Sequence, residues 1–156
     1  MKKQPLISVI VASYNYAKYI KETLDSLIRQ TNKSFEVIVV DDGSKDQSLP
    51  IIEEYANRFK NIKLYTHPGN QNRGLAETVI LGIEKSNGEY IAFCESDDYW
   101  TNNHIEYLQD TIQQNPLANF IVNGIKVINL SSKNIQAVTY FPTLIQTISP
   151  HSPPFV

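Results

Sequence analysis

The sequence predicts an α/β fold, a Rossmann-like three-layer sandwich built around a mostly parallel sheet. Short apolar runs rich in β-branched residues alternate four times with segments whose apolar residues recur at helical spacing, over about 100 residues. Such alternation forms right-handed βαβ units, which place helices on both faces of a parallel sheet. At 156 residues, 42% hydrophobic and 19% charged, the chain is long enough for one domain with a substantial core.

The first strand and helix are expected at residues 6–12 and 17–30. Residues 6–12 read LISVIVA, an almost wholly apolar run that is typical of a strand covered on both faces. In the following segment, apolar residues recur at helical spacing from Ile20 to Ile28, and Asn15 is a suitable N-terminal cap.

The second strand and helix follow the same pattern. Residues 35–40 read FEVIVV, and two aspartates end this strand abruptly. We expect a helix from there to about Phe59, capped by Asp46 or Ser48, with Pro50 tolerated because it lies in the first turn.

A third pair is predicted from a shorter strand at residues 62–66 and a helix after the loop at residues 67–74. Asn87 and Gly88 should close that helix in a left-handed conformation. The apolar stripe of the helix consists of Leu75, Ala76, Val79, Ile80 and Ile83.

The fourth strand, residues 90–94, reads YIAFC and resembles a fully buried strand. An acidic run, Glu95, Ser96, Asp97 and Asp98, follows where the strand leaves the core. Three carboxylates within four residues repel one another, so the run is either a hydrated turn or a site for a divalent cation. The run by itself leaves both interpretations open.

The remaining residues give a weaker signal. A helix is expected over residues 105–112, ended by Asn115 and Pro116, and a strand interrupted by polar residues over 119–128. Beyond Leu130 no clear period is present. We therefore predict one domain at residues 1–130, followed at residues 131–156 by an irregular tail or the start of an acceptor-side region.

Composition narrows the classes of function. The net charge of −2 gives no reason to expect nucleic acid or an anionic membrane surface as a partner. The single cysteine, Cys94, excludes an internal disulfide and favours a reducing compartment. No apolar stretch approaches the length that crosses a bilayer, so a cytoplasmic protein is expected.

Polar clusters follow three of the predicted strands. They are Ser13, Tyr14 and Asn15 after the first, Asp41 and Asp42 after the second, and residues 95–98 after the fourth. Because ligands of open parallel sheets bind at the carboxyl ends of strands, we expect the three clusters to line one crevice.

The chemistry of that crevice differs from that of a dinucleotide site. Neither GxGxxG nor GxxxxGK[ST] follows the first strand, so a backbone cradle for phosphate is missing and hydride transfer is disfavoured. Asp41 and Asp42 could accept hydrogen bonds from a ribose or a base, and Tyr14 offers a face for stacking. Asp97 and Asp98 holding Mg²⁺ or Mn²⁺ would neutralise a diphosphate.

Four segments carry a family resemblance: SVIVASYN (residues 8–15), VVDDGSKD (39–46), NRGLA (72–76) and GEYIAFCESDD (88–98). In this order and spacing they resemble the nucleotide-binding half of a family 2 glycosyltransferase of the GT-A fold. The resemblance covers residues 6 to about 115. Each motif alone is weak, but four in register are specific.

The resemblance implies an inverting transferase with a DxD-type metal site that moves a sugar from a nucleotide-sugar, most often a UDP-sugar, to a glycan or lipid-linked acceptor. It also implies cell-envelope polysaccharide synthesis, with peripheral association at the inner face of the membrane through a region beyond residue 156. The implied nucleotide-binding residues are Ala12, Tyr14, Asn15, Asp41, Asp42, Arg73 and Asp97, and the implied metal ligands are Asp98 and Asp97.

Two departures from the family pattern affect the prediction. Glu95 stands where the family's D-x-D-D run begins, and no Asp or Glu follows Asp110, although the family's catalytic base is a later carboxylate. The catalytic base is therefore expected beyond residue 156. The alternative function is a catalytically incomplete nucleotide-sugar-binding module. A metal-dependent phosphohydrolase would leave Asp41 and Asp42 without a task. The sequence makes no prediction of oligomeric state.

Overall fold

A four-stranded parallel sheet forms the centre of the computed structural model, in agreement with the predicted fold class. The structure describes residues 7–115, 117 and 120–122, together with the backbone of residues 125–129, 134–139 and 144–146. The sheet order is β3-β2-β1-β4, and each neighbouring pair in it is parallel. Its strands are β1 (Ile7–Ser13), β2 (Phe35–Asp41), β3 (Ile62–Thr66) and β4 (Tyr90–Phe93).

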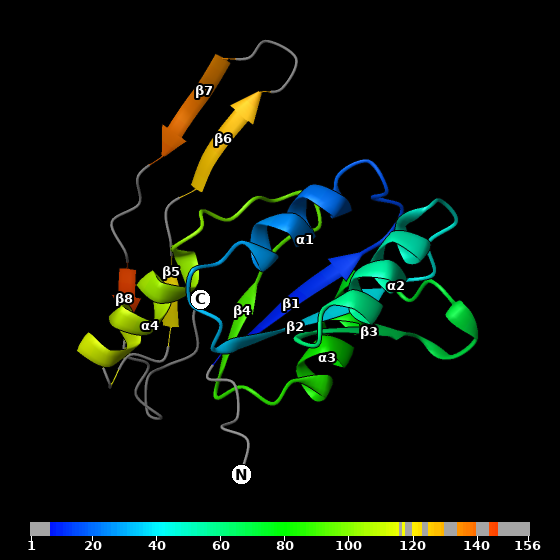
Figure 1. Cartoon of the computed structure of the whole chain (residues 1–156), viewed down its shortest axis with the longest axis horizontal. Helices are drawn as coiled ribbons and strands as arrows, with labels where there is room; N and C mark the ends of the chain where they lie inside the picture. Colours follow the sequence, from blue (N-terminus) through cyan, green and yellow to red (C-terminus); the bar gives the residue numbers. More distant parts are fainter. Residues whose placement is uncertain are drawn as a thin grey trace, which may run out of the picture. The chain divides into compact units, whose positions relative to one another are not determined.

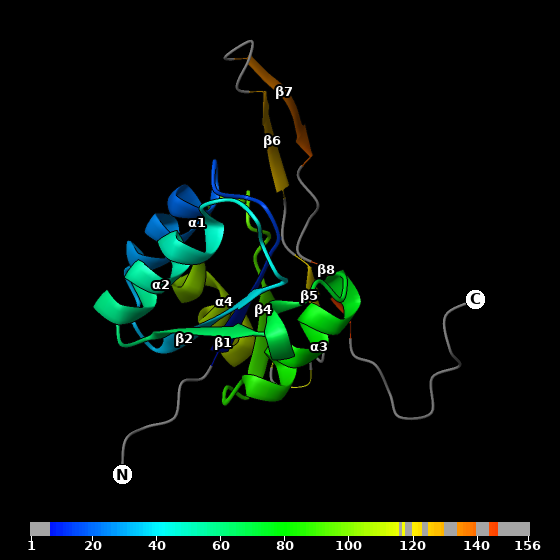
Figure 2. The same ribbon diagram turned by 90° about the vertical axis from the view of Figure 1, so that its right-hand side faces the viewer.

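Helices cover both faces of this sheet, as the alternation of strand and helix predicts. The helices α1 (Ile20–Ile28) and α2 (Ser48–Arg58) lie on one face, and α3 (Leu75–Lys85) lies on the other (Figures 1 and 2). α3 approaches β1 closely, because a Cβ at Gly82 would be 2.6 Å from Cγ2 of Ile10. The fully buried core includes Val9, Val11, Leu24, Val37, Val39 and Ile52.

The start of α1 differs from the prediction. The helix begins at Ile20 rather than at Ala17, and its N-terminus has no side-chain cap. Asn15, the predicted cap, lies five residues earlier in the chain than Ile20 and has a φ of 58°. The backbone amides of residues 15–17 donate to side chains of the β2–α2 loop and of Ser48, the first residue of α2, which holds this segment outside helix α1.

The buried face of α3 is also different from the predicted apolar stripe. Leu75 is 62% exposed, and Ile80 and Ile83 are exposed as well. The residues of α3 that are buried are Thr78 and Gly82, because small side chains allow the helix to lie close against β1. Apolar spacing alone therefore identified the helix but not the face that packs on the sheet.

The predicted left-handed end of α3 is not observed. Its C-terminal cap is Ser86 in an extended conformation, and Gly88 has no positive φ. Gly88 instead lies against β1, where an added Cβ would be 2.6 Å from the backbone nitrogen of Ser8. The glycine is required by close packing of two backbones rather than by a turn.

Strand β4 is not the fully buried strand that its composition predicts. Among the residues that the structure describes, it pairs only with β1 and forms one edge of the four-stranded sheet, and its Phe93 is 56% exposed. Cys94, the next residue, is buried and donates its backbone N–H to the carbonyl of Ile10. An apolar strand at a sheet edge has the same composition as a central one, so sequence could not separate the two.

A buried carboxylate lies near the amino ends of the strands, on the face that α3 covers. Glu36 accepts hydrogen bonds from the Ser8 hydroxyl at 2.7 Å, the Lys63 ammonium at 2.7 Å and the backbone N–H of Asn87 at 2.6 Å. Burial alone would raise the pKa of Glu36, but these donors and the charge of Lys63 outweigh it and lower the pKa.

The chain divides into two compact units, Met1–Tyr107 and Leu108–Val156. After α4 (His104–Gln114), the predicted strand at 119–128 is two strands, and two further strands occupy part of the tail that was predicted to be irregular. β5 pairs with β8 and β6 with β7, both antiparallel. A domain boundary at residue 130 stays a prediction. These strands are β5 (Phe120–Val122), β6 (Ile125–Asn129), β7 (Asn134–Thr139) and β8 (Leu144–Gln146).

Within the described residues, no helix combines the length and the hydropathy needed to cross a bilayer.

Candidate functional site

A pocket of about 420 Å³ lies where β1, β2 and β4 end. It brings together four of the seven implied nucleotide-binding residues, from three separate segments of the chain: Ala12, Tyr14, Asp42 and Asp97. The expected crevice at the carboxyl ends of the strands is therefore present. The other lining residues are Ser13, Tyr16, Asn72, Gly74, Leu75, Thr78, Glu95 and Ser96.

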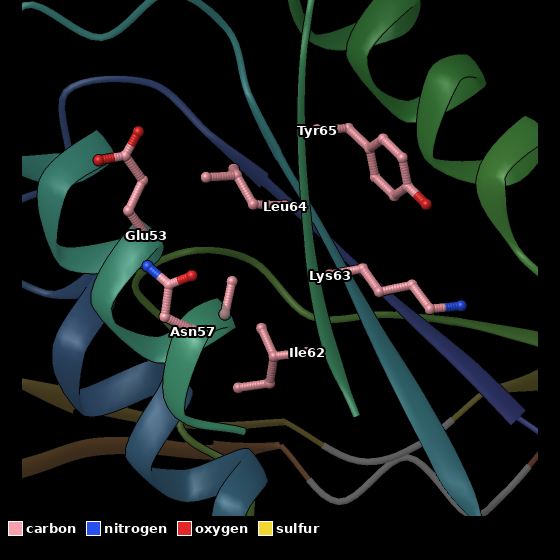
Figure 3. Close-up of a pocket in the computed structure, with 7 residues that line it drawn as sticks. Glu53, Asn57, Ile62, Lys63, Leu64 and Tyr65 are labelled. Carbon is pink, nitrogen blue, oxygen red and sulfur yellow. The ribbon is translucent and has the colours of Figure 1, made fainter. Parts of the chain in front are cut away.

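A second cavity, of about 530 Å³, lies between α2 and β3, the strand at the edge of the sheet away from β4. Figure 3 shows Ile62 and Leu64 directed toward α2, while Lys63 and Tyr65 project to the other side of the strand. None of the polar clusters that follow the strands reaches this cavity. We take the smaller pocket as the candidate site because ligands of open parallel sheets bind at strand carboxyl ends.

Asp42 holds the loop that forms one wall of the pocket. Its Oδ1 accepts the backbone N–H of Arg73 at 2.6 Å, and its Oδ2 accepts that of Gly74 at 2.8 Å. A carboxylate has about four acceptor positions, so this one keeps acceptor capacity toward the pocket. Arg73 contributes its backbone to this arrangement, and its side chain is exposed and does not line the pocket.

A buried histidine lies behind Asp42 and was predicted only as part of a loop. His67 Nε2 is 3.1 Å from Thr78 Oγ1 and 3.6 Å from Oδ1 of Asp42. The Thr78 hydroxyl donates its only hydrogen to the carbonyl of Gly74 at 2.9 Å, so it accepts from His67, whose Nε2 carries a hydrogen. His67 and Thr78 thus support the loop that Asp42 holds. The one available signal was the position of His67 directly after a strand.

Asp41, the other acid after β2, is directed away from the pocket. Its side chain is fully buried, and its two oxygens accept the backbone N–H of Ser44 at 2.9 Å and the Ser44 hydroxyl at 2.5 Å. It stabilises the turn after β2 and is not among the residues that line the pocket. Asp42 therefore lines the pocket and Asp41 does not, a difference that the sequence did not predict.

The backbone amides of the loop after β1 are not available to bind phosphate. Its amides at Asn15, Tyr16 and Ala17 donate to the side chains of Ser44, Ser48 and Asp46 at 2.8 to 3.0 Å. Amides that bind phosphate at the start of a helix must be free, and these are occupied. The side chain of Asn15 accepts the N–H of Lys45 at 2.7 Å and lies outside the pocket lining.

The acidic loop after β4 carries three carboxylates with unfavourable mutual charge. Partial burial, and after it the neighbouring carboxylates, raise the pKa values of Glu95 and Asp98. Asp97 and Glu95 line the pocket, whereas Asp98 does not. Across the part of the chain that the structure describes, no group of three His, Cys, Asp or Glu side chains is arranged to hold a metal ion.

Comparison with known proteins identifies the family. A family model described as glycosyl transferase family 2 matches residues 8–152. An uncharacterized glycosyltransferase of Haemophilus influenzae is 37% identical over 113 residues, which are 72% of this chain and 44% of the relative. The putative glycosyltransferase EpsH of Bacillus subtilis is 43% identical over 110 residues, which are 69% of this chain and 30% of the relative.

A solved structure supports the same assignment. S. aureus TarS 1-349 in complex with UDP-GlcNAc matches with a TM-score of 0.65 and 29% identity, covering 80% of this chain and 40% of TarS 1-349. The chain thus spans less than half the length of these relatives. Because the family model matches most of the sequence, and the parallel sheet with its pocket at the strand ends agrees with it, this chain belongs to glycosyl transferase family 2.

Proposed function

We propose that this chain binds a nucleotide-sugar, most favourably a UDP-sugar, as the donor-binding part of a glycosyltransferase. The observation that carries the proposal is the single pocket that joins Tyr14, Asp42 and Asp97. These three side chains offer an aromatic face, a hydrogen-bond acceptor and an anionic cation ligand. A nucleotide diphosphate has a base, a donor N–H and a charged diphosphate to match them.

The base and ribose would lie at the end of the pocket formed by Tyr14 and Asp42. Tyr14 is partly exposed at the pocket wall, so its ring is available for stacking. Asp42 is held by two backbone N–H groups, which fixes its carboxylate before any ligand binds. The solved complex of S. aureus TarS with UDP-GlcNAc favours uridine over other bases.

The negative charge of the acidic loop supports the binding of a divalent metal ion, Mg²⁺ or Mn²⁺. Partial burial, and after it repulsion among the carboxylates, raise the pKa values of Glu95 and Asp98, and a bound cation would offset both. Mg²⁺ commonly takes only one or two protein carboxylates and completes its shell with phosphate oxygens and water. Asp97 and Asp98 would hold the ion, which when bound neutralises the diphosphate leaving group. Of the two, Asp97 is the better supported, because it lines the pocket.

The transfer step itself also needs a base that deprotonates the acceptor hydroxyl. Residues 111–156 contain no Asp or Glu, so no residue of this chain is assigned that role. Inversion at the anomeric carbon, and a glycan or lipid-linked acceptor, are proposed from family membership. The second candidate is a donor-binding module without transfer activity, because no residue of this sequence is assigned as that base.

Calorimetry with UDP, GDP and dTDP, each with and without Mn²⁺, tests the donor site. We expect Mn²⁺ to strengthen UDP binding, and Asp97→Ala and Asp98→Ala to remove that enhancement. Glu84→Ala, an exposed acid on α3, is the matched control and should leave it unchanged. The assignment of the acidic loop is wrong if both aspartate variants retain Mn²⁺-dependent UDP binding.

Assays of sugar release and transfer distinguish the two candidates. An active transferase should release UDP from UDP-sugar in the presence of Mn²⁺, faster with acceptor present. A binding module should show the same affinity with no release above background.

A further inference from the structure

One side of α1 and Gln30, two residues past its end, carry buried polar side chains. Thr23, Ser26 and Gln30 recur at i, i+3 and i+7, and all three are at most 1% exposed. A helix packed in a protein interior normally presents apolar residues, because a buried polar group is unfavourable unless it is hydrogen-bonded. The sequence prediction for this helix did not single out these three residues.

The partners of this polar stripe lie in the acidic loop and the segment after it. The Thr23 hydroxyl donates to the carbonyl of Ser96 at 3.0 Å, and the backbone N–H of Trp100 donates to the Ser26 hydroxyl at 3.2 Å. Ser26 in turn donates to the carbonyl of Thr23 at 2.7 Å. These hydrogen bonds, at Ser96 and at Trp100, lie on either side of Asp97 and Asp98 in the chain.

Gln30 extends the same attachment toward α4. Its Nε2 donates to the carbonyl of Thr101 at 2.7 Å and to that of Ser26 at 3.1 Å, and its Oε1 accepts the N–H of Ile105 at 3.0 Å. Both hydrogens of the amide are therefore used. The amide has only one orientation that satisfies these groups, because Thr101 offers an acceptor and Ile105 a donor.

The loop has little internal support apart from these bonds. Within residues 95–101, the backbone hydrogen bond is the turn from Asp98 N–H to the carbonyl of Glu95, at 3.0 Å. An apolar side chain at position 30 would fill the same space but would lose the hydrogen bonds to the loop at Thr101 and to α4 at Ile105.

We propose that Gln30, together with Thr23 and Ser26, is a positioning residue for Asp97 and Asp98. The inference rests on the proposed function, because it takes these aspartates as the ligands of the donor's cation. Gln30 touches neither donor nor metal; it sets the position of the loop that carries the ligands. Groups that orient metal ligands commonly change metal affinity by about 10- to 100-fold when they are removed.

The chain contains a natural probe of this loop, because Trp100 is its single tryptophan. Gln30→Met keeps the length of the side chain and removes its hydrogen bonds, and Leu24→Met, at a fully buried position of α1, is the control. In metal-free protein we expect faster amide exchange at Trp100 and Ile105, and stronger acrylamide quenching of Trp100, in Gln30→Met only. Gln30→Glu keeps an acceptor for Ile105 but loses the donor to Thr101, so Ile105 should stay protected while Trp100 is quenched more.

Calorimetry then measures UDP affinity with and without Mn²⁺. Gln30→Met should weaken the Mn²⁺-dependent affinity by about 10- to 100-fold and leave metal-free UDP affinity unchanged. If wild type shows no Mn²⁺-dependent binding, the proposed function fails and the inference fails with it. If wild type shows it and Gln30→Met matches wild type, only the inference is overturned. Should Gln30→Met not fold, Ser26→Ala, which removes the acceptor for Trp100, is expected to give the same two effects.

Discussion

The half-buried ion pair between Lys63 and Glu36 provides a direct test of how the sheet is stabilised. Lys63 Nζ lies 2.7 Å from Glu36 Oε2, and the two side chains are 40% and 5% exposed. Lys63→Met keeps most of the length of the side chain and removes its charge. Glu36 then remains buried with hydrogen bonds from Ser8 and Asn87 but without a cation.

The expected cost follows from the partial burial of the pair. Exposed ion pairs contribute about 0 to 1 kcal/mol, and loss of one partner from a fully buried pair costs about 3 to 5 kcal/mol. Because Glu36 is buried and Lys63 is only half covered, we expect Lys63→Met to lower the free energy of unfolding by about 2 kcal/mol at pH 7.

The same pair predicts a dependence on pH. The pKa of Glu36 is lowered in the folded protein, so its contribution is present above the unfolded pKa, about 4.3 for a glutamate, and is lost as the pH falls through the folded value. The stability deficit of Lys63→Met should therefore be full at pH 7 and should shrink in acid, where Glu36 is protonated in both proteins.

Urea denaturation at several pH values measures these differences. Lys21→Met is the matched control, because Lys21 forms an ion pair of 3.0 Å with Asp25 while 66% exposed, and its loss should cost much less stability than that of Lys63. Equal costs for the two lysine variants at pH 7, or a Lys63→Met deficit that persists unchanged at acidic pH, would refute this reasoning.

Three further predictions concern packing, thiol reactivity and the donor site. Gly88→Ala should destabilise the fold by about 1 to 3 kcal/mol in urea denaturation, because its Cβ would lie 2.6 Å from Ser8 N; unchanged stability would contradict the close approach. Cys94 should react with a thiol reagent only after unfolding, since burial, followed by the charges of Asp98, Glu95 and Asp97, raises its pKa; rapid labelling of native protein would show that the thiol is accessible. Tyr14→Ala should weaken UDP binding by about 1 to 3 kcal/mol in calorimetry, while Tyr14→Phe should retain it. If Tyr14→Ala binds UDP as tightly as the wild type, stacking on this ring is excluded.

Much of the fold could be predicted from sequence, because periodicity and composition are local properties. The four strands of the main sheet and the helices between them lie where apolar runs and helical spacing place them. The errors in predicted burial arose because local pattern does not specify which elements pack beside a strand or helix. The edge position of β4 and the exposed apolar side of α3 depend on which elements pack beside them.

The candidate site could likewise be predicted only in part. The carboxyl ends of parallel strands necessarily lie along one edge of a sheet, so the meeting of Tyr14, Asp42 and Asp97 was predictable from the order of the elements. The different orientations of Asp41 and Asp42 were not, because adjacent residues in a turn point to different sides according to the turn geometry.

The sequence by itself determined the parallel sheet, the end of the sheet where the candidate pocket lies and the acidic character of that end. Only the tertiary structure decided which carboxylates face the pocket, and it alone showed that Thr23, Ser26 and Gln30 are tied to the acidic loop. The physical reason is that a buried polar side chain is stabilised by partners far away in the chain, about 70 residues in this case, and no local pattern specifies them.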